Sequence, residues 1–195
     1  MAEKRETLTK LKIKNAFVEL VNEKGMESLT ISDIARKAKI NRGTFYLHYV
    51  DKIDLLEQLE TDVLLDLEVI FEKYDKGITN EPVEIIPYEA ILEALKYVRN
   101  DFAFVSALMN IGGNSKTTER LKQLIGETIQ KQISRSENLS FKMGNLPPDY
   151  AQEILLSGIL SIILLWIKKG ALETPEEIAA MITKAKQIAP NELLL

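Results

Sequence analysis

Side chains suited to contacting DNA lie close together between Thr30 and Lys52. A guanidinium such as that of Arg42 can hydrogen-bond O6 and N7 of one guanine together. Gly43 has no side chain, so the backbone there could approach a DNA groove closely. The hydroxyl of Thr44 can bond a phosphate, and its methyl can contact a thymine. These residue types in this order predict the base-reading edge of a DNA-binding protein.

Further candidate contacts flank this edge. Leu47 and His48 are expected on the exposed side of the same helix. Tyr46 is expected to hold a phosphate, with packing against the helix-turn-helix core as the alternative. His48 is the only histidine, and no second ligand or nucleophile lies beside it, so neither metal binding nor catalysis is expected there. The predicted DNA-contact residues are Thr30, Ser32, Asn41, Arg42, Gly43, Thr44, Tyr46, Leu47, His48 and Lys52. Among them Thr30, Ser32, Tyr46 and Lys52 are the expected phosphate contacts, the first two from a helix N-terminus.

Two short helices and a tight turn must position these side chains. Thr30 with Asp33 three residues later predicts a capped helix from Ile31 to Ala38. Lys39 and Ile40 then form a turn. Asn41 is the expected N-cap of the second helix, on which Phe45 and Tyr49 face inward, and Asp51 caps a third helix. The pattern is that of a helix-turn-helix unit.

The spacing Gly25-x4-Thr30-x2-Asp33-Ile34-Ala35, followed by Asn41-Arg42-Gly43-Thr44-Phe45-Tyr46-x-His48-Tyr49-x2-Lys52, resembles the DNA-binding domain of TetR/AcrR-family bacterial transcription regulators. The resemblance covers about the first quarter of the chain. Two positions depart from the family pattern. Lys39 stands where the family usually has glycine in the turn, and Met26 stands where it usually has an aromatic residue. A residue other than glycine in a left-handed turn costs on the order of 1 kcal/mol.

Charge is distributed unevenly along a chain whose net charge is -4. Residues 1–52 carry 11 Lys and Arg against 7 Asp and Glu, whereas residues 53–195 carry 14 against 22. A basic segment can supply the phosphate-directed attraction that dominates DNA affinity, and an acidic remainder should repel DNA. Cysteine is absent, which excludes disulfides and thiolate metal sites. The segment 1–14 has no apolar signal core, and the longest apolar run, 154–167, is shorter than a membrane span, so a cytoplasmic protein is expected.

The rest of the chain predicts helices and no strands. We expect an all-α fold with a DNA-binding domain at 1–52 and a helical regulatory and dimerisation domain at 53–195. Proline, glycine and polar residues mark loops at 75–82 and 134–148. Apolar periodicity predicts helices at 8–24, 52–74, 88–100, about 101–111, 117–133, 148–169 and 175–185.

The last two helices predict a subunit interface. The helix at 148–169 is apolar on nearly all sides at its centre, so it must be covered all round. Two such helices from each of two chains would form a four-helix interface, and the family resemblance implies the same. A purely intramolecular core is the alternative. The predicted interface residues are Leu156, Ile159, Leu160, Ile163, Ile178, Met181 and Ile182.

A ligand pocket in the C-terminal region is implied by the resemblance. The region from Tyr88 on, with its Phe-rich middle helix and Gly-Gly break, resembles a C-terminal domain common in Firmicutes TetR-like regulators. Aromatic and methionine residues at helical spacing could equally be core. The candidate pocket residues are Tyr97, Phe102, Phe104, Met109 and Trp166. No catalytic constellation, metal site or cofactor motif is found in the sequence, so no enzyme activity and no cofactor are expected.

The sequence thus predicts a homodimeric repressor that binds a palindromic DNA operator and is released by a small-molecule effector. Two alternatives remain open. One is a transcriptional activator of the same family, because the sign of regulation depends on where the operator lies. The other is a helical adaptor protein whose helix-turn-helix unit no longer binds DNA. The effector, the operator and the regulated genes are not specified by the sequence.

Overall fold

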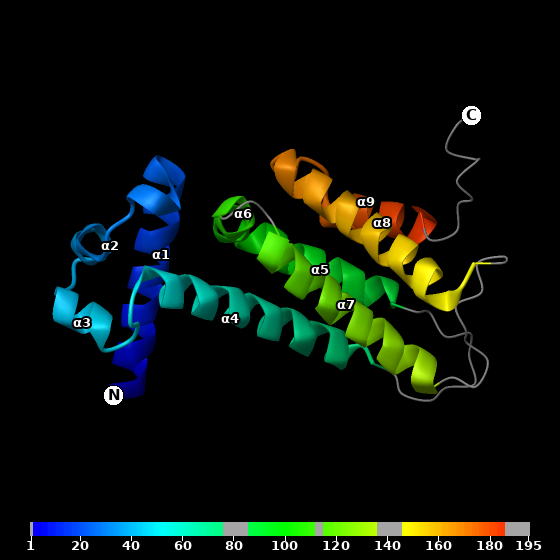
Figure 1. The fold of residues 1–195 in the computed structure, drawn as a ribbon, viewed down its shortest axis with the longest axis horizontal. Coiled ribbons are helices and arrows are strands. Elements are labelled where there is room, and N and C mark those ends of the chain that lie inside the picture. Colours follow the sequence, from blue (N-terminus) through cyan, green and yellow to red (C-terminus); the bar gives the residue numbers. More distant parts are fainter. Residues whose placement is uncertain (1, 76–85, 112–114, 136–145, 186–195) are drawn as a thin grey trace. The chain divides into compact units, whose positions relative to one another are not determined.

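The computed structural model describes residues 2–75, 86–111, 115–135 and 146–185, and these residues form helices joined by turns (Figure 1). No strand occurs among them, which confirms the predicted all-α fold. The helices are α1 (Ala2–Ser28), α2 (Ile31–Lys37), α3 (Arg42–Tyr46), α4 (Lys52–Lys73), α5 (Tyr88–Asn100), α6 (Phe102–Asn110), α7 (Ser115–Arg135), α8 (Pro148–Lys168) and α9 (Pro175–Ala185). The expected loops at 75–82 and 134–148 fall mostly outside the described residues.

The chain groups into two compact units. The head unit comprises Met1–Leu65 with Ala103–Thr118, and the body unit comprises Asp66–Phe102 with Glu119–Leu195. This grouping differs from the predicted boundary between residues 52 and 53. Helix α4 continues through that boundary and contributes to both units, and α6 belongs with the head.

The head unit is built around fully buried side chains of α1, α2 and α3. Phe17, Ile34 and Phe45 have no exposed surface, and Leu29 is 1% exposed. Helix α1 starts earlier and ends later than the predicted 8–24, with a break at Gly25, whose φ of 76° lies in the left-handed region. Because glycine adopts this conformation without a Cβ clash, the chain can turn there toward α2.

The turn between α2 and α3 has the left-handed residue that the sequence predicts. Lys39 has φ 56°, and the Ile40 N–H donates to the Ala35 carbonyl at 3.0 Å, the closing bond of a Schellman motif. A lysine in this position retains the steric cost of about 1 kcal/mol that a glycine would avoid. The surrounding buried contacts hold the turn despite that cost.

Two polar contacts tie α6 and the start of α7 to the rest of the head unit. The Lys14 ammonium of α1 lies 3.7 Å from the centre of the Phe104 ring of α6, a cation–π arrangement. The Thr117 hydroxyl of α7 donates to a carboxylate oxygen of Glu60 at 2.6 Å, and Glu60 is only 6% exposed. A buried carboxylate needs such donors, since an unpaired one would be costly. The Ala103–Thr118 segment is therefore anchored within the head unit.

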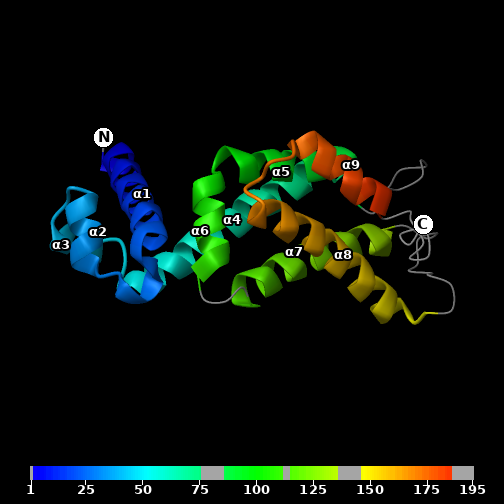
Figure 2. The same cartoon turned by 90° about the horizontal axis from the view of Figure 1, so that it is seen from above.

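The body unit packs the C-terminal half of α4 with α5, α7, α8 and α9 (Figure 2). Trp166 of α8 is 1% exposed, and its indole N–H donates to the Glu173 carbonyl at 2.9 Å. The Arg99 guanidinium of α5 donates to the same carbonyl at 2.8 Å, which fixes the connection between α8 and α9. Thr174 and Glu177 form a capping box at the start of α9.

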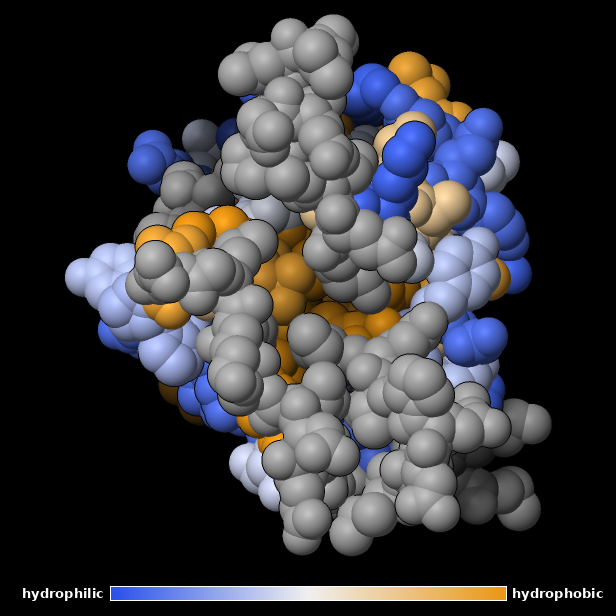
Figure 3. Space-filling model, turned by 90° about the vertical axis from the view of Figure 1, so that its right-hand side faces the viewer, coloured by the Kyte–Doolittle hydropathy of each residue, from blue (hydrophilic) through white to orange (hydrophobic). Residues whose placement is uncertain are grey.

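Helix α8 is both long and predominantly apolar. Its 21 residues are long and apolar enough to cross a membrane by length and composition alone, although the apolar run in the sequence spans only 14 residues. A core helix of a soluble protein meets the same criterion. Figure 3 shows hydrophobic surface near the centre of this end of the body unit and hydrophilic residues toward the outer edges of the view.

Candidate functional site

Helix α3 is held in place by the aromatic residues on one side of it. Phe45 is fully buried and Tyr49 is 5% exposed, and their ring centres lie 5.6 Å apart. Burial, with the nearby carboxylates of Asp62 and Asp54, raises the pKa of Tyr49 to about 12, so its hydroxyl stays neutral. The predicted packing role of both residues agrees with this geometry.

The opposite side of α3 is open. Arg42 and Gly43 at its N-terminus are exposed, Tyr46 is 49% exposed and Leu47 is 82% exposed. Exposed leucine is unfavourable in water, so a surface of this kind suits contact with another molecule. The structure thus brings the predicted α3 residues to one surface. We call it the α3 surface, comprising Asn41, Arg42, Gly43, Thr44, Tyr46, Leu47 and His48.

Asn41 differs from its predicted role as a helix cap. It occupies the N-cap position with extended backbone angles, φ -75° and ψ 150°, but its side chain makes no capping hydrogen bond. The amide of Asn41 is exposed instead. It therefore belongs to the α3 surface through its amide rather than to the helix end.

Gly43 faces open space. A Cβ built on Gly43 would meet no atom within 4 Å, and no left-handed backbone angle requires glycine there. The fold of the protomer therefore gives no reason for a glycine at this position. Close approach of a partner is the remaining physical reason.

The N-terminus of α2 is organised by Asp33. Its carboxylate accepts from the Lys24 ammonium at 2.5 Å, from the Arg36 guanidinium at 2.7 Å and from the Thr30 hydroxyl at 2.6 Å. The bonds from Lys24 and Thr30 hold the pKa of Asp33 well below its usual range. The Thr30 hydroxyl thus serves the capping box, while Ser32 on the same turn is exposed.

Lys52, a predicted phosphate contact, bonds to backbone carbonyls of its own chain. Its ammonium donates to the carbonyls of Met26, Glu27 and Leu29 at 3.0, 3.1 and 2.8 Å. These carbonyls lie at the end of α1, where helix carbonyls lack partners within the helix. All three protons of the ammonium are engaged, so in this structure Lys52 joins α4 to the end of α1 rather than reaching toward a phosphate.

Replacing Lys52 with methionine tests this reading. The change keeps the aliphatic stem and removes the donors, and we expect the free energy of unfolding to fall by about 1–3 kcal/mol. Urea denaturation measures it. The salt dependence of DNA binding should stay unchanged. A slope reduced by about one unit, with stability unaltered, would instead return Lys52 to the phosphate contacts.

Sequence reasoning missed one exposed residue beside the α3 surface. Val50 is 78% exposed, and its N–H donates to the Asp54 carboxylate at 2.7 Å, which fixes the chain entering α4. The sequence feature that could have identified Val50 is its spacing. Leu47 and Val50 lie three residues apart, on the side opposite the buried Phe45 and Tyr49. Two apolar residues on the outward side indicate an apolar part of the contact surface.

The structure does not bring the five candidate pocket residues together. Phe104 and Met109 are buried in the head unit, and Trp166 is buried against the α8–α9 connection. The Tyr97 hydroxyl donates to the Asp66 carboxylate at 2.9 Å on the surface, and Phe102 is half-buried. None of the five lines the apolar cavity or the polar groove of the body unit that are described next. Phe104, Met109 and Trp166 are core residues, as the alternative interpretation of the sequence allowed.

The cavities lie elsewhere in the body unit. An apolar cavity is walled by aliphatic residues of α4, α5, α7 and α8, among them Leu67, Ile91 and Ile125. A polar groove runs between α4 and α7, with Phe71 shared by the two. Aliphatic residues that line a cavity look in the sequence like any other core residues. Choosing pocket candidates by their aromatic character therefore missed this cavity.

Most of the predicted interface residues are buried inside the protomer, which corrects the predicted interface. Leu156, Ile159, Leu160, Ile178 and Ile182 are at most 5% exposed, and Ile163 lines the apolar cavity. Only Met181 is exposed, at 49%. Because α8 is apolar all round, the sequence could not show which side faces the protomer core.

The outward side of α8 carries a different set of residues. Tyr150, Ile154 and Leu165 are 62%, 49% and 58% exposed, and Gly158 and Ser161 are exposed between them. Their spacing places them on one face of the helix. A Cβ on Gly158 would meet no atom within 4 Å. We call these five residues the α8 seam.

Models of known families match both parts of the chain. Residues 13–59 match the family described as bacterial regulatory proteins, tetR family. Residues 87–186, half of the chain, match a family described as transcriptional regulator C-terminal region. The chain belongs to the TetR family of transcriptional regulators. Proteins of this family bind DNA through the helix-turn-helix unit and are not enzymes.

Relatives of known name agree with this assignment. The chain is 22% identical over 171 residues to the uncharacterized HTH-type transcriptional regulator YxbF of Bacillus subtilis (strain 168), covering 87% of this chain and 42% of that protein. It spans less than half the length of the curated relatives that it matches.

Solved structures share the fold. NalD, the secondary repressor of the MexAB-OprM multidrug efflux pump in Pseudomonas aeruginosa, is 23% identical with a TM-score of 0.67, covering 94% of this chain and 95% of NalD. The dihydroxyacetone kinase operon activator DhaS is 20% identical with a TM-score of 0.60, covering 92% of this chain and 94% of DhaS. At these identities the similarity concerns the fold.

Proposed function

We propose that this TetR-family regulator is a cytoplasmic homodimeric repressor that binds a palindromic operator through two copies of α3 and is released by a small-molecule effector. The observation that carries the proposal is the α3 surface. It joins an exposed arginine, a glycine facing open space and an exposed leucine on a helix anchored by Phe45. Arg42 would read a base edge, while Thr44, Tyr46 and Ser32 would meet phosphates. His48 and Asn41 would complete the contact.

Dimerisation is proposed through the α8 seam. Ile154 and Leu165 are 49% and 58% exposed, so this face leaves apolar area in water that a twofold-related copy would cover. Gly158 and Ser161 at the centre would let the two helices approach closely. Met181 on α9 would extend the contact. A dimer is required for a palindromic operator, since each protomer contributes one reading helix.

Effector control is proposed through the apolar cavity of the body unit. Helix α4 contributes Leu67 and Phe71 to this cavity and also belongs to the head unit. A ligand that prefers one arrangement of α4 would shift the equilibrium between spacings of the two heads. The ligand must bind the two arrangements with different affinity, or nothing shifts.

Replacing Gly43 with alanine separates folding from DNA contact. The added methyl meets no protein atom, and alanine is the better helix former, so the free energy of unfolding should stay equal or rise by about 0.5–1 kcal/mol. Operator affinity should nevertheless fall, because the methyl occupies space needed by the groove. Thermal unfolding and a binding titration on the same sample measure the two effects. Unchanged affinity would remove Gly43 from the contact.

The direction of regulation needs its own experiment, because the similar structures include one named a repressor and one named an activator. Promoters bound in the cell are identified by crosslinking and immunoprecipitation, and their transcripts are measured with the gene intact and deleted. A repressor predicts higher transcription in the deletion strain. Lower transcription would make the protein an activator. Complementation with the Gly43→Ala variant controls for effects unrelated to DNA binding.

A further inference from the structure

The apolar cavity of the body unit excludes polar ligand groups from its interior. It is open to solvent at its mouth, and its lining exposes no polar surface. The wall is formed by side chains such as Leu67, Ile91, Leu121 and Ile159. A hydroxyl, amide or carboxylate buried there would lose its water without gaining a partner. The buried part of a ligand must therefore be hydrocarbon.

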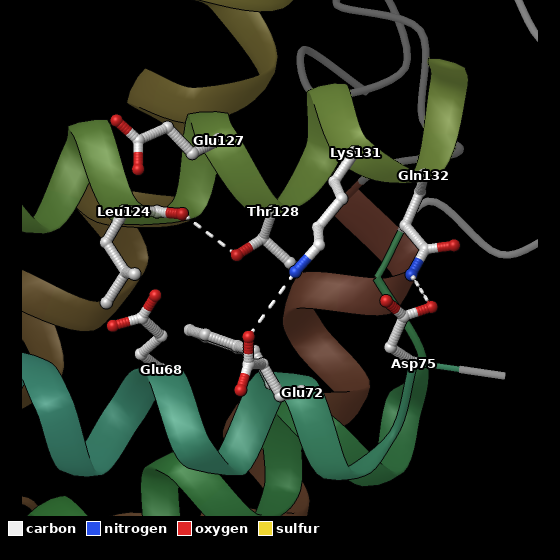
Figure 4. Close-up of a pocket in the computed structure, with 9 residues that line it drawn as sticks. Glu68, Glu72, Asp75, Leu124, Glu127, Thr128, Lys131 and Gln132 are labelled. Carbon is white, nitrogen blue, oxygen red and sulfur yellow. Dashed lines mark hydrogen bonds and ion pairs between the residues drawn. The ribbon is translucent and has the colours of Figure 1, made fainter. Parts of the chain in front are cut away.

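The adjoining polar groove has the opposite character (Figure 4). It is lined by four carboxylates, those of Glu68, Glu72, Asp75 and Glu127, and by a single ammonium, that of Lys131. The carboxylates come from both sides, since the first three belong to α4 and its end and the last to α7. A group that leaves the cavity on this side enters a region of negative charge.

Three of the four carboxylates have partners within the protein, and one of these partners is charged. The Lys131 ammonium lies 3.4 Å from a Glu72 carboxylate oxygen, and the Gln132 amide donates to Asp75 at 3.0 Å (Figure 4). Glu127 accepts from the Gln123 amide at 2.8 Å. Among the described lining residues, one ammonium accompanies four carboxylates, so these side chains together carry an excess of negative charge, which an added cation would reduce.

Phe71 joins the two places. It lines both the cavity and the groove, and it is half-buried on α4. The residues that line the cavity with Phe71 are aliphatic, and four of those that line the groove with it are acidic. An aromatic ring at that point can also attract a cation over its face.

We propose that the effector of this protein is a cationic amphiphile, with its aliphatic chain in the apolar cavity and its ammonium head among the carboxylates of the α4–α7 groove. The inference rests on the proposed effector-controlled function and specifies the chemical class of the ligand. Charge complementarity selects this occupant. A carboxylate head in the same position would face like charge, and an uncharged head would gain no attraction.

Three probes built on eight-carbon chains test the proposal without DNA. Octyltrimethylammonium, 1-octanol and octanoate are titrated into the full-length protein by calorimetry, below micelle-forming concentrations and at low salt. We expect the ammonium probe to bind about tenfold more tightly than octanol and octanoate to bind most weakly, and the preference to shrink as salt rises. Octanoate binding equal to or tighter than the ammonium, or no binding by any probe, overturns the proposal.

Matched variants locate the binding. The double variant Glu68→Gln and Glu72→Gln should remove the preference for the ammonium while leaving octanol affinity unchanged. Lys131→Gln should act in the opposite direction and tighten ammonium binding severalfold. Ala94→Leu, which fills the cavity wall on α5, should weaken all three probes. Retained helicity by circular dichroism checks folding. A preference that survives the double variant places the cation elsewhere and contradicts the proposal.

A separate experiment tests whether the bound ligand acts as an effector. Operator release is measured with the ammonium probe, against a control of probe with DNA alone, because cationic amphiphiles bind DNA themselves. Binding with the expected preference but without release would support the ligand class and contradict effector control. Release by the ammonium probe that the Ala94→Leu variant abolishes would support both.

Discussion

Replacing Arg42 with alanine should lower operator affinity by about 1–3 kcal/mol per half-site, roughly ten- to a hundredfold, and relax the preference at one base pair. The expected loss is large because a guanidinium bonds two acceptors of guanine together, which alanine cannot replace. Arg42 is exposed at the start of α3, so the change should leave stability within about 0.5 kcal/mol. Affinities for the operator and for all its single-base variants measure the effect.

The matched control for Arg42 is Arg36 of α2. Arg36 is also exposed, but its guanidinium pairs with Asp33 at 2.7 Å and belongs to the preceding helix. Arg36→Ala should change affinity for all sequences alike, if at all. If the two variants produced the same base-preference profile, Arg42 would have no special reading role.

Replacing Leu165 with glutamate should convert the dimer to a monomer and lower operator affinity at least about a hundredfold. Leu165 is 58% exposed at the end of the α8 seam, so a protomer can accept the carboxylate there. Twofold symmetry would bring two such charges into one apolar contact, where each would lose water without a partner. Losing the second reading head removes the advantage of two linked binding events. Analytical ultracentrifugation and operator titration measure the two losses together.

The control for the interface is Val69→Glu. Val69 is 65% exposed on α4, so the same charge is introduced at an exposed apolar position away from α8. The Val69→Glu protein should remain dimeric and bind the operator with wild-type affinity. A Leu165→Glu protein that stays dimeric would contradict the α8 seam, whereas a wild-type monomer at micromolar concentration would contradict dimerisation altogether.

Local signals predicted the helix-turn-helix unit well. Capping residues, turn residues and the inward spacing of Phe45 and Tyr49 act over a few positions, so a single sequence displays them. The helix at 88–100 and the end of α8 near Gly170 were predicted for the same reason. The left-handed backbone of Lys39 was expected because similar proteins usually have glycine at this position of the turn.

Long-range packing could not be read in the same way. Trp166 and Phe104 proved to be buried in different units, because aromatic character indicates burial and not what the side chain packs against. The three carbonyl partners of Lys52 lie 23 to 26 residues away in the chain, so a local sequence pattern does not predict these hydrogen bonds. An all-apolar helix such as α8 likewise hides which side remains exposed.

The central claim is that the α3 surfaces of a dimer read one palindromic DNA sequence. Selection of bound sequences from random duplex DNA by the purified full-length protein tests it most directly, followed by titration of the selected sequence against salt. We predict a palindromic consensus, with half-sites about one helical turn apart and an affinity that falls steeply with salt. Weak binding without a consensus would contradict the claim.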